Sequence, residues 1–151
     1  SLLAVGDSLL AYGAGRSYGD AALNAGGRSV IMSRLNRFLA FDPQSGMLVA
    51  EAGATFGEVL DTLLPLGFAP PVVPGTGFAT LGGGVAADVH GKNHHQAGSL
   101  GQHIEWLDLR LPSGEVRRIE PARDDTLFRA TLGGVGLTGV IERNVIQKVL
   151  A

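Results

Sequence analysis

One run of small residues, with polar side chains near its end, is the part of this sequence best suited to chemistry. Residues 75–95 combine several glycines with His90, Lys92, His94 and His95. Because glycine has no Cβ, a ligand can approach the main chain of such a run closely. An imidazole titrates near neutral pH, and an ammonium group can stabilise negative charge. The run therefore predicts a binding surface on which His90 and Lys92 face a reacting group.

A second glycine loop lies upstream, at residues 13–20. A glycine turn that follows a strand can present backbone N–H groups as a nest for an anion. Arg16 adds a positive charge and Ser17 a hydroxyl group, which together suit a pyrophosphate. The glycine spacing is neither that of the Rossmann fingerprint nor that of a Walker A loop. An ordinary tight turn is the alternative reading.

A third glycine turn occupies residues 133–139. Taken alone, this segment is typical of a tight turn with glycine at positive φ. Its functional reading is a backbone wall beside a ligand. The first two glycine segments together suggest a large, phosphate-containing ligand held between them.

Four histidines raise the question of a metal site, namely His90, His94, His95 and His103. On a strand, the adjacent side chains of His94 and His95 would point to opposite faces. No carboxylate nearby completes a common ligand set. The sequence also lacks a Gly-x-Ser-x-Gly elbow for a nucleophilic serine. We therefore predict no metal.

Composition narrows the class of protein. The chain has 151 residues, of which 45% are hydrophobic, so we expect one globular domain over residues 1–151. Twelve basic and 14 acidic residues give a formal net charge of −2, which argues against a nucleic-acid partner. Cysteine is absent, and no apolar run reaches the roughly 18 residues that a membrane span needs. We expect a cytoplasmic protein.

Hairpins and helices alternate along the chain, which predicts an α+β fold rather than a doubly wound parallel sheet. Thr55 and Glu58 have the spacing of a capping box, and apolar residues at helical spacing follow them. Helices are expected over residues 56–64, 80–87 and 124–131. Strands are expected over residues 9–13, 29–33, 38–42, 47–51, 104–111, 115–119 and 139–150.

Four segments together resemble a known family. Residues 15–20, residues 74–84, the run His90-Gly91-Lys92-Asn93-His94-His95, and residues 133–139 are similar to the FAD-binding domain of the vanillyl-alcohol-oxidase-type flavoproteins. These enzymes are FAD-linked oxidases with a PCMH-type domain. The resemblance extends from about Leu9 to about Lys148, and the run from His90 is its most specific part. It implies a two-lobed α+β domain with FAD between the lobes.

The resemblance also implies roles for individual residues. Those expected to wrap the pyrophosphate are Gly13, Ala14, Gly15, Arg16, Ser17 and Tyr18. Those expected to continue toward the ribityl chain and the ring are Gly75, Thr76, Thr80, Gly82, Gly83 and Ala86. Those expected near the flavin and the substrate mouth are His90, Gly91, Lys92 and Asn93. Those expected at the adenine end are Gly139, Val140 and Ile141.

The activity that the resemblance implies is oxidation of a sugar or polyol hydroxyl, of a substrate that could be lipid-linked, by hydride transfer to flavin N5. Lys92 would place positive charge near the reduced ring or a substrate oxygen, and His90 would orient the hydroxyl. Family members with a covalent flavin carry a histidine in the first glycine loop. Arg16 stands there in this sequence, and no cysteine is present. The resemblance therefore favours non-covalent FAD.

Such enzymes also have a substrate-binding domain, usually downstream. We expect this domain, and the family's opening strand and helix, to lie outside residues 1–151. We therefore expect a fragment of a longer enzyme that is inactive alone. Two alternatives stay open. One is a non-catalytic module that binds a nucleotide or phosphate. The other is a glycine-rich structural domain with no ligand.

Overall fold

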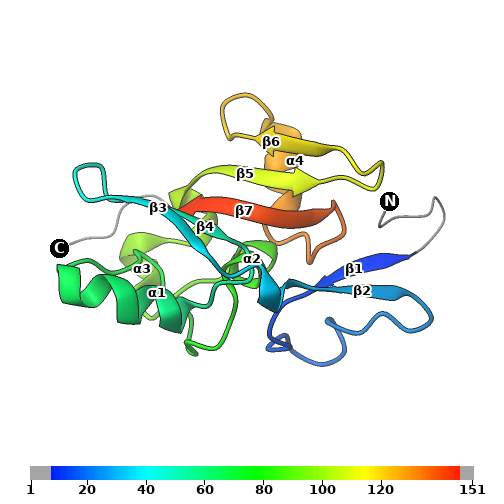
Figure 1. Cartoon of the computed structure of the whole chain (residues 1–151), viewed down its shortest axis with the longest axis horizontal. Helices are drawn as coiled ribbons and strands as arrows, with labels where there is room; N and C mark the ends of the chain where they lie inside the picture. The colour runs from blue at the N-terminus through cyan, green and yellow to red at the C-terminus, as the bar shows by residue number, and fades with distance from the viewer. Residues whose placement is uncertain (1–7, 147–151) are drawn as a thin grey trace.

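The chain folds into two sheets with helices beside them. The computed structural model describes residues 8–146. Strand β1 (Leu9–Tyr12) pairs in parallel with β2 (Arg28–Ile31) to form a two-stranded sheet. The other strands form a five-stranded sheet in the order β3-β4-β7-β5-β6, in which every pair is antiparallel. Figure 1 shows the β1–β2 pair set apart from the larger sheet. This architecture confirms the α+β prediction.

The larger sheet is built from two hairpins with one strand inserted between them. The hairpin strands are β3 (Phe38–Asp42), β4 (Met47–Glu51), β5 (Ile104–Arg110) and β6 (Val116–Ile119). Strand β7 (Val140–Ile146) lies between β4 and β5 and joins the hairpins into one sheet. The sequence predicts this last strand over residues 139–150, of which residues 147–150 lie outside the described part of the chain.

The turn of the first hairpin depends on one carboxylate. Asp42 accepts hydrogen bonds from the backbone N–H of Gln44 at 2.9 Å and from the hydroxyl of Ser45 at 2.5 Å. These bonds lower the pKa of Asp42 below its ordinary value. An aspartate at the start of a turn commonly acts in this way.

Two of the helices begin at threonine caps. Helix α1 (Phe56–Leu63) has the predicted capping box, in which the Thr55 hydroxyl accepts from the N–H of Glu58 and the Glu58 carboxylate accepts from the N–H of Thr55. Helix α2 (Leu81–Ala86) is capped by the hydroxyl of Thr80. Helix α4 (Asp125–Thr131) matches its prediction closely. Short 3-10 turns occupy Met32–Arg34, Leu64–Leu66 and Leu100–His103.

A single helical turn, α3 (His94–Ala97), contains His94 and His95. The sequence did not predict this element. The carbonyl of Asn93 accepts from the N–H groups of Gln96 and Ala97, both at 2.9 Å, and the turn ends at Gly98 with φ of 68°. A helix of one turn is too short to leave a periodic pattern in the sequence.

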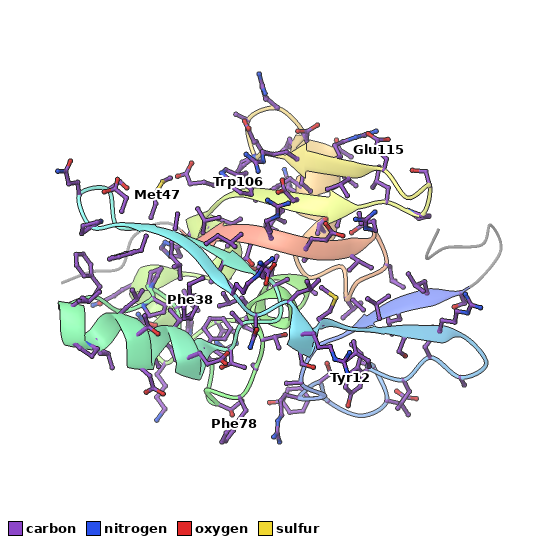
Figure 2. The ribbon with its side chains drawn as sticks, viewed as in Figure 1. Tyr12, Phe38, Met47, Phe78, Trp106 and Glu115 are labelled. Atoms are coloured by element: carbon purple, nitrogen blue, oxygen red, sulfur yellow. The ribbon has the colours of Figure 1, made fainter. Side chains whose placement is uncertain are left out.

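The core lies between the helices and one face of the five-stranded sheet. That face presents the fully buried side chains of Leu107, Leu109 and Ile119, and Phe56 of α1 and Val85 of α2 belong to the same cluster. The opposite face carries ion pairs. Asp108 lies between Arg118 at 2.8 Å and Arg143 at 3.6 Å. The guanidinium of Arg118 also stacks on the ring of Trp106, which Figure 2 labels.

The end of β4 is where the parts of the molecule meet. We call residues 51–54 the junction; all four are buried. Its hydrogen bonds reach β7 (Ala52 N–H to Glu142 O, 2.9 Å) and the start of α2 (Gly82 N–H to Ala52 O, 2.8 Å). A further bond, from Gly53 N–H to Leu35 O at 2.7 Å, reaches the segment that leads from β2 to β3. The junction therefore fixes both sheets and α2 relative to one another.

Within residues 8–146, no helix has the length and apolar character needed to cross a bilayer.

Replacing Gly53 with alanine should destabilise the fold strongly. A Cβ at this position would collide with the carbonyl of Met32 and would lie 2.6 Å from the carbonyl oxygen of Leu35. Backbone atoms cannot yield as a flexible side chain can, so we expect a loss of about 2 kcal/mol or more in the free energy of unfolding. Urea denaturation measures it. The Gly75→Ala variant, whose Cβ would meet nothing within 4 Å, should unfold like the wild type; equal stability of both variants would contradict this packing.

Candidate functional site

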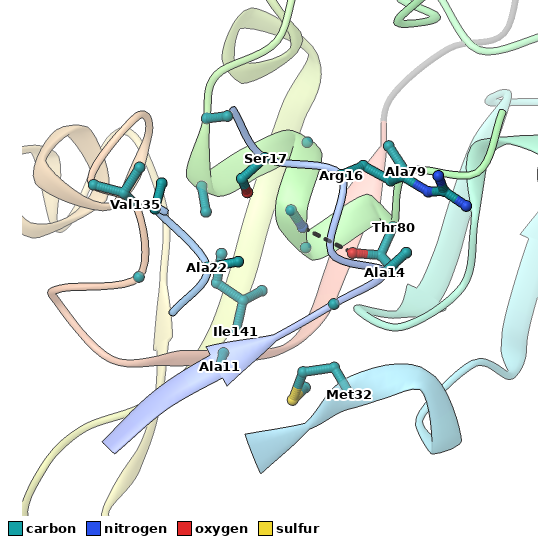
Figure 3. Close-up of a pocket in the computed structure, with 18 of the residues that line it drawn as sticks. Ala11, Ala14, Arg16, Ser17, Ala22, Met32, Ala79, Thr80, Val135 and Ile141 are labelled. Carbon is teal, nitrogen blue, oxygen red and sulfur yellow. Dashed lines mark hydrogen bonds between the residues drawn. The ribbon is translucent and has the colours of Figure 1, made fainter. Parts of the chain in front are cut away.

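A cavity of about 350 Å³ lies between the β1–β2 pair, helix α2, the start of β7 and the third glycine turn. Its volume is within the range typical of small-molecule sites. Figure 3 shows its walls: Ala11 from β1, Met32 after β2, Ile141 from β7 and Val135 from the turn. The first glycine loop runs along the side nearest α2. Segments far apart in the sequence therefore converge on one concave surface.

The first glycine loop offers unused hydrogen-bond donors to this cavity. Residues Ala14–Tyr18 all line it. In the part of the chain that the structure describes, the backbone N–H groups of these five residues make no hydrogen bond to protein. Gly15 has φ of +62°, a conformation that suits glycine and bends the loop tightly. Free amides on a tight loop are the arrangement that binds phosphate oxygens.

Helix α2 gives the cavity room for a ligand, but the backbone N–H groups of its first turn are not free to bind one. The N–H groups of Leu81 and Gly82 donate to the junction carbonyls of Ala54 and Ala52, and that of Gly83 donates to the Thr80 hydroxyl. The sequence predicted that amides of this run would hold the ligand, whereas these three are engaged within the protein. The wall is nevertheless shallow, because Gly82 and Gly83 carry no side chains that would enter the cavity.

The third glycine turn is held against the end of α2. The N–H of Gly133 donates to Val85 O at 3.2 Å, and the N–H of Val135 donates to Ala86 O at 2.9 Å. Val135 has φ of +46°, which is strained for a β-branched residue. Such strain persists only where the surrounding structure imposes it, and it is concentrated at functional sites. Here it places the Val135 side chain on the cavity wall.

Arg16 dominates the electrostatics of the cavity. It is the one charged side chain among the lining residues within the described range 8–146. Its guanidinium also lies 5.2 Å from the ring centroid of Phe78, which is 69% exposed and which Figure 2 shows pointing outward. The contact links the first glycine loop to the segment before α2. A positive group above a mostly apolar cavity favours an anionic ligand.

Most of the predicted cofactor residues come together in this cavity. Those that line it are Gly13, Ala14, Gly15, Arg16, Ser17, Tyr18, Thr80, Gly82, Gly83, Ala86, Gly139 and Ile141. The predicted residues outside it are Gly75, Thr76, His90, Gly91, Lys92 and Asn93. Val140 is buried in β7 beside Ile141.

The His90–Asn93 segment begins where the cavity wall ends. Val89 lines the cavity, and the next residue, His90, is exposed. Asn93 holds the segment in place by donating its side-chain N–H to the carbonyl of Pro71 at 3.1 Å. Lys92 is exposed and extends from this held segment. The four residues therefore lie beside the cavity and outside it.

The imidazoles cluster without forming a metal site. The rings of His90 and His94 are 5.2 Å apart between centroids, and those of His94 and His95 are 6.0 Å apart. Among the described residues, no group of three or more histidine, aspartate, glutamate or cysteine side chains is placed to hold a metal ion. His103 contacts the carbonyl of Ala97 at 2.7 Å and thereby closes α3 onto the following 3-10 turn.

Sequence reasoning missed several lining residues, most of them small or apolar: Leu10, Ala11, Ala21, Ala22, Met32, Ala52, Ala79, Gly84, Ala87, Val89, Val135 and Gly136. An alanine side chain has no functional group, so its presence in a sequence does not indicate a binding site. A run of small residues beside a glycine loop, such as Ala21-Ala22, is the one pattern that could have indicated a close approach.

Comparison with known proteins agrees with this geometry. Residues 4–120 match the family described as FAD binding domain. The chain is 45% identical over 143 residues to decaprenylphosphoryl-beta-D-ribose oxidase of Mycolicibacterium smegmatis, covering 94% of this chain and 31% of that protein. It is 26% identical over 118 residues to L-gulonolactone oxidase 3 of Arabidopsis thaliana, covering 74% and 20%. It is 23% identical over 138 residues to D-lactate dehydrogenase of Anaerostipes hadrus, covering 88% and 29%.

The chain thus spans about a third or less of the length of these curated relatives. The family match covers well over half of the chain, and it includes the first glycine loop and all of α2. The cavity, the free amides of its loop and the family match point to the same ligand class. The chain belongs to the FAD-binding domain family of the FAD-linked oxidoreductases.

Proposed function

We propose that the cavity binds FAD without a covalent bond and that the chain is the cofactor domain of an enzyme that oxidises a sugar or polyol hydroxyl. The observation that carries this proposal is the row of free backbone N–H groups from Ala14 to Tyr18, together with the positive side chain of Arg16. Both lie on the wall of an otherwise mostly apolar cavity. The family match supports the identity of the ligand.

The lining residues fit the parts of this cofactor. The amides of Ala14–Tyr18, with the charge of Arg16, would hold the pyrophosphate, because charge-assisted bonds to phosphate oxygens are strong and directional. The bare surface at Gly82 and Gly83 would accept the flat or extended parts of the molecule. Ile141 and Val135 would provide apolar contacts to a ring.

Non-covalent attachment is supported by the composition of the wall. Within the described range, no histidine or cysteine lines the cavity, and Arg16 occupies the centre of the first loop. The histidines of residues 90–95 lie outside.

When bound, the flavin supplies a hydride acceptor. The side chains of this domain would act at its edge. Lys92, exposed beside the cavity, would place positive charge near developing negative charge, and His90 would orient a substrate hydroxyl. A base and most of the substrate pocket would come from residues outside this chain. The names of two relatives, a decaprenylphosphoryl-beta-D-ribose oxidase and an L-gulonolactone oxidase, support a sugar-like substrate. Lipid linkage and a cytoplasmic location stay predictions.

The chain should bind FAD reversibly. Titration of FAD into the purified chain should quench the flavin fluorescence and shift its visible spectrum, because the ring moves from water into an apolar site. Acid precipitation should release all the flavin into the supernatant, since no covalent bond retains it. A chain that binds FMN or ATP but not FAD would favour the simpler phosphate-binding module. Flavin retained in the pellet would refute non-covalent attachment.

Replacing Gly83 with valine should weaken FAD binding at least tenfold, about 1.4 kcal/mol. A Cβ here would meet the Thr80 hydroxyl at 3.0 Å and nothing else within 4 Å, so the larger side chain would extend into the cavity. Glycine is already a poor helix former, so the stability of the apo-protein should hardly change.

The matched control is Ala130→Val, which adds the same β-branched side chain on the exposed surface of α4, away from the cavity. It should leave the FAD dissociation constant unchanged. Wild-type affinity in the Gly83 variant would remove this wall from the site.

A further inference from the structure

The segment between the two sheets forms part of the cavity. The chain leaves β2 at Ile31, makes the 3-10 turn Met32–Arg34, and enters β3 at Phe38. We call residues 32–37 the connection. Met32 is 4% exposed and lines the cavity opposite α2. The position of the connection therefore determines how far one wall lies from the other.

A buried carboxylate holds the far end of the connection. Glu51, in the junction, accepts the backbone N–H of Arg37 at 2.9 Å and the Arg37 guanidinium through Nη2 at 2.7 Å and Nε at 3.2 Å. Two backbone bonds run in parallel, from Glu51 N–H to Arg37 O at 2.9 Å and from Gly53 N–H to Leu35 O at 2.7 Å. The side chain of Glu51 thus ties the main chain as well as the side chain of Arg37.

The two partners differ sharply in burial. The Glu51 side chain is 7% exposed and that of Arg37 is 74% exposed. The hydrogen bonds from Arg37 lower the pKa of Glu51 against the opposing effect of burial. The carboxylate therefore stays charged at neutral pH. If it loses its charge, the guanidinium can return to water, and the connection keeps mainly its backbone bonds.

We propose that Glu51 is a positioning residue that sets the width of the cofactor cavity by clamping the connection to the junction. The inference rests on the proposed function, because it concerns the affinity of the cavity for FAD. Neither Glu51 nor Arg37 lines the cavity, so neither is expected to touch the cofactor. Their effect is transmitted by Met32, at the other end of the connection.

The test is Glu51→Gln in the full chain, with Asp108→Asn as the matched control. Asp108 is a carboxylate of similar burial, 8% exposed, that pairs with Arg118 on the same face of the same sheet but does not touch the connection. Three quantities are measured for each variant: the FAD dissociation constant, the visible circular dichroism of bound flavin, and amide hydrogen exchange of Gly53 in the apo-protein. Urea denaturation establishes that each variant is folded.

We expect Glu51→Gln to raise the FAD dissociation constant about tenfold, to change the circular dichroism of the flavin, and to speed Gly53 exchange about tenfold. Asp108→Asn should lose stability while keeping the affinity and spectrum of the wild type. Equal effects of the two variants on affinity would overturn the inference, since the loss would then be general destabilisation. Unchanged affinity and exchange in Glu51→Gln would overturn it directly.

Should Glu51→Gln fail to fold, Arg37→Lys replaces it. Lysine keeps the charge but loses the two-pronged contact, so a dissociation constant raised at least threefold supports the clamp and an unchanged one overturns it. Absence of FAD binding by the wild type would refute the proposed function alone. In that case faster Gly53 exchange in Glu51→Gln, but not in Asp108→Asn, would still support the clamp, and equal exchange would refute it.

Discussion

The buried main chain at the end of β4 holds the other parts of the fold in place through its hydrogen bonds. Four consecutive residues, 51–54, lie inside the protein, where unpaired backbone groups are costly. Their hydrogen bonds to other segments reach three parts of the fold: β7, the start of α2, and the connection from the smaller sheet. Small side chains at Ala52, Gly53 and Ala54 make this convergence possible, since larger ones would push the partners apart. The cavity exists because this convergence leaves a gap between α2 and the β1–β2 pair.

The α2 wall and the first-loop wall of this gap differ in whether their backbone amides are free. On the α2 side, the amide donors are used by the protein, and the wall is bare because of its glycines. On the loop side, the amides from Ala14 to Tyr18 are free and Arg16 supplies charge. The α2 wall therefore gives a ligand room to approach, and the first loop provides hydrogen-bond donors and positive charge for an anion. An elongated ligand with an anionic centre satisfies both, which is why a dinucleotide suits this cavity better than a small uncharged metabolite.

Local sequence signals predicted local structure well. The capping box at Thr55 and the short helix α2 each depend on a few neighbouring residues, and the sequence predicted both. The single turn α3 was not predicted, because one helical turn has no periodicity. The predicted first loop lines the cavity, whereas Gly75, Thr76 and His90 do not. Residues such as Met32 and Ala52 reach the site through long-range packing around the junction, and no short motif encodes that.

An NMR titration of FAD into the isotope-labelled chain, with the backbone amides assigned, would locate the bound cofactor. We predict that the largest shifts fall on the amides of Ala14–Tyr18, with smaller ones at Gly83 and Val135 elsewhere on the cavity wall. Shifts confined to another surface, such as the apolar hollow beside Phe38 and Leu66, with the first-loop amides unmoved, would contradict this prediction.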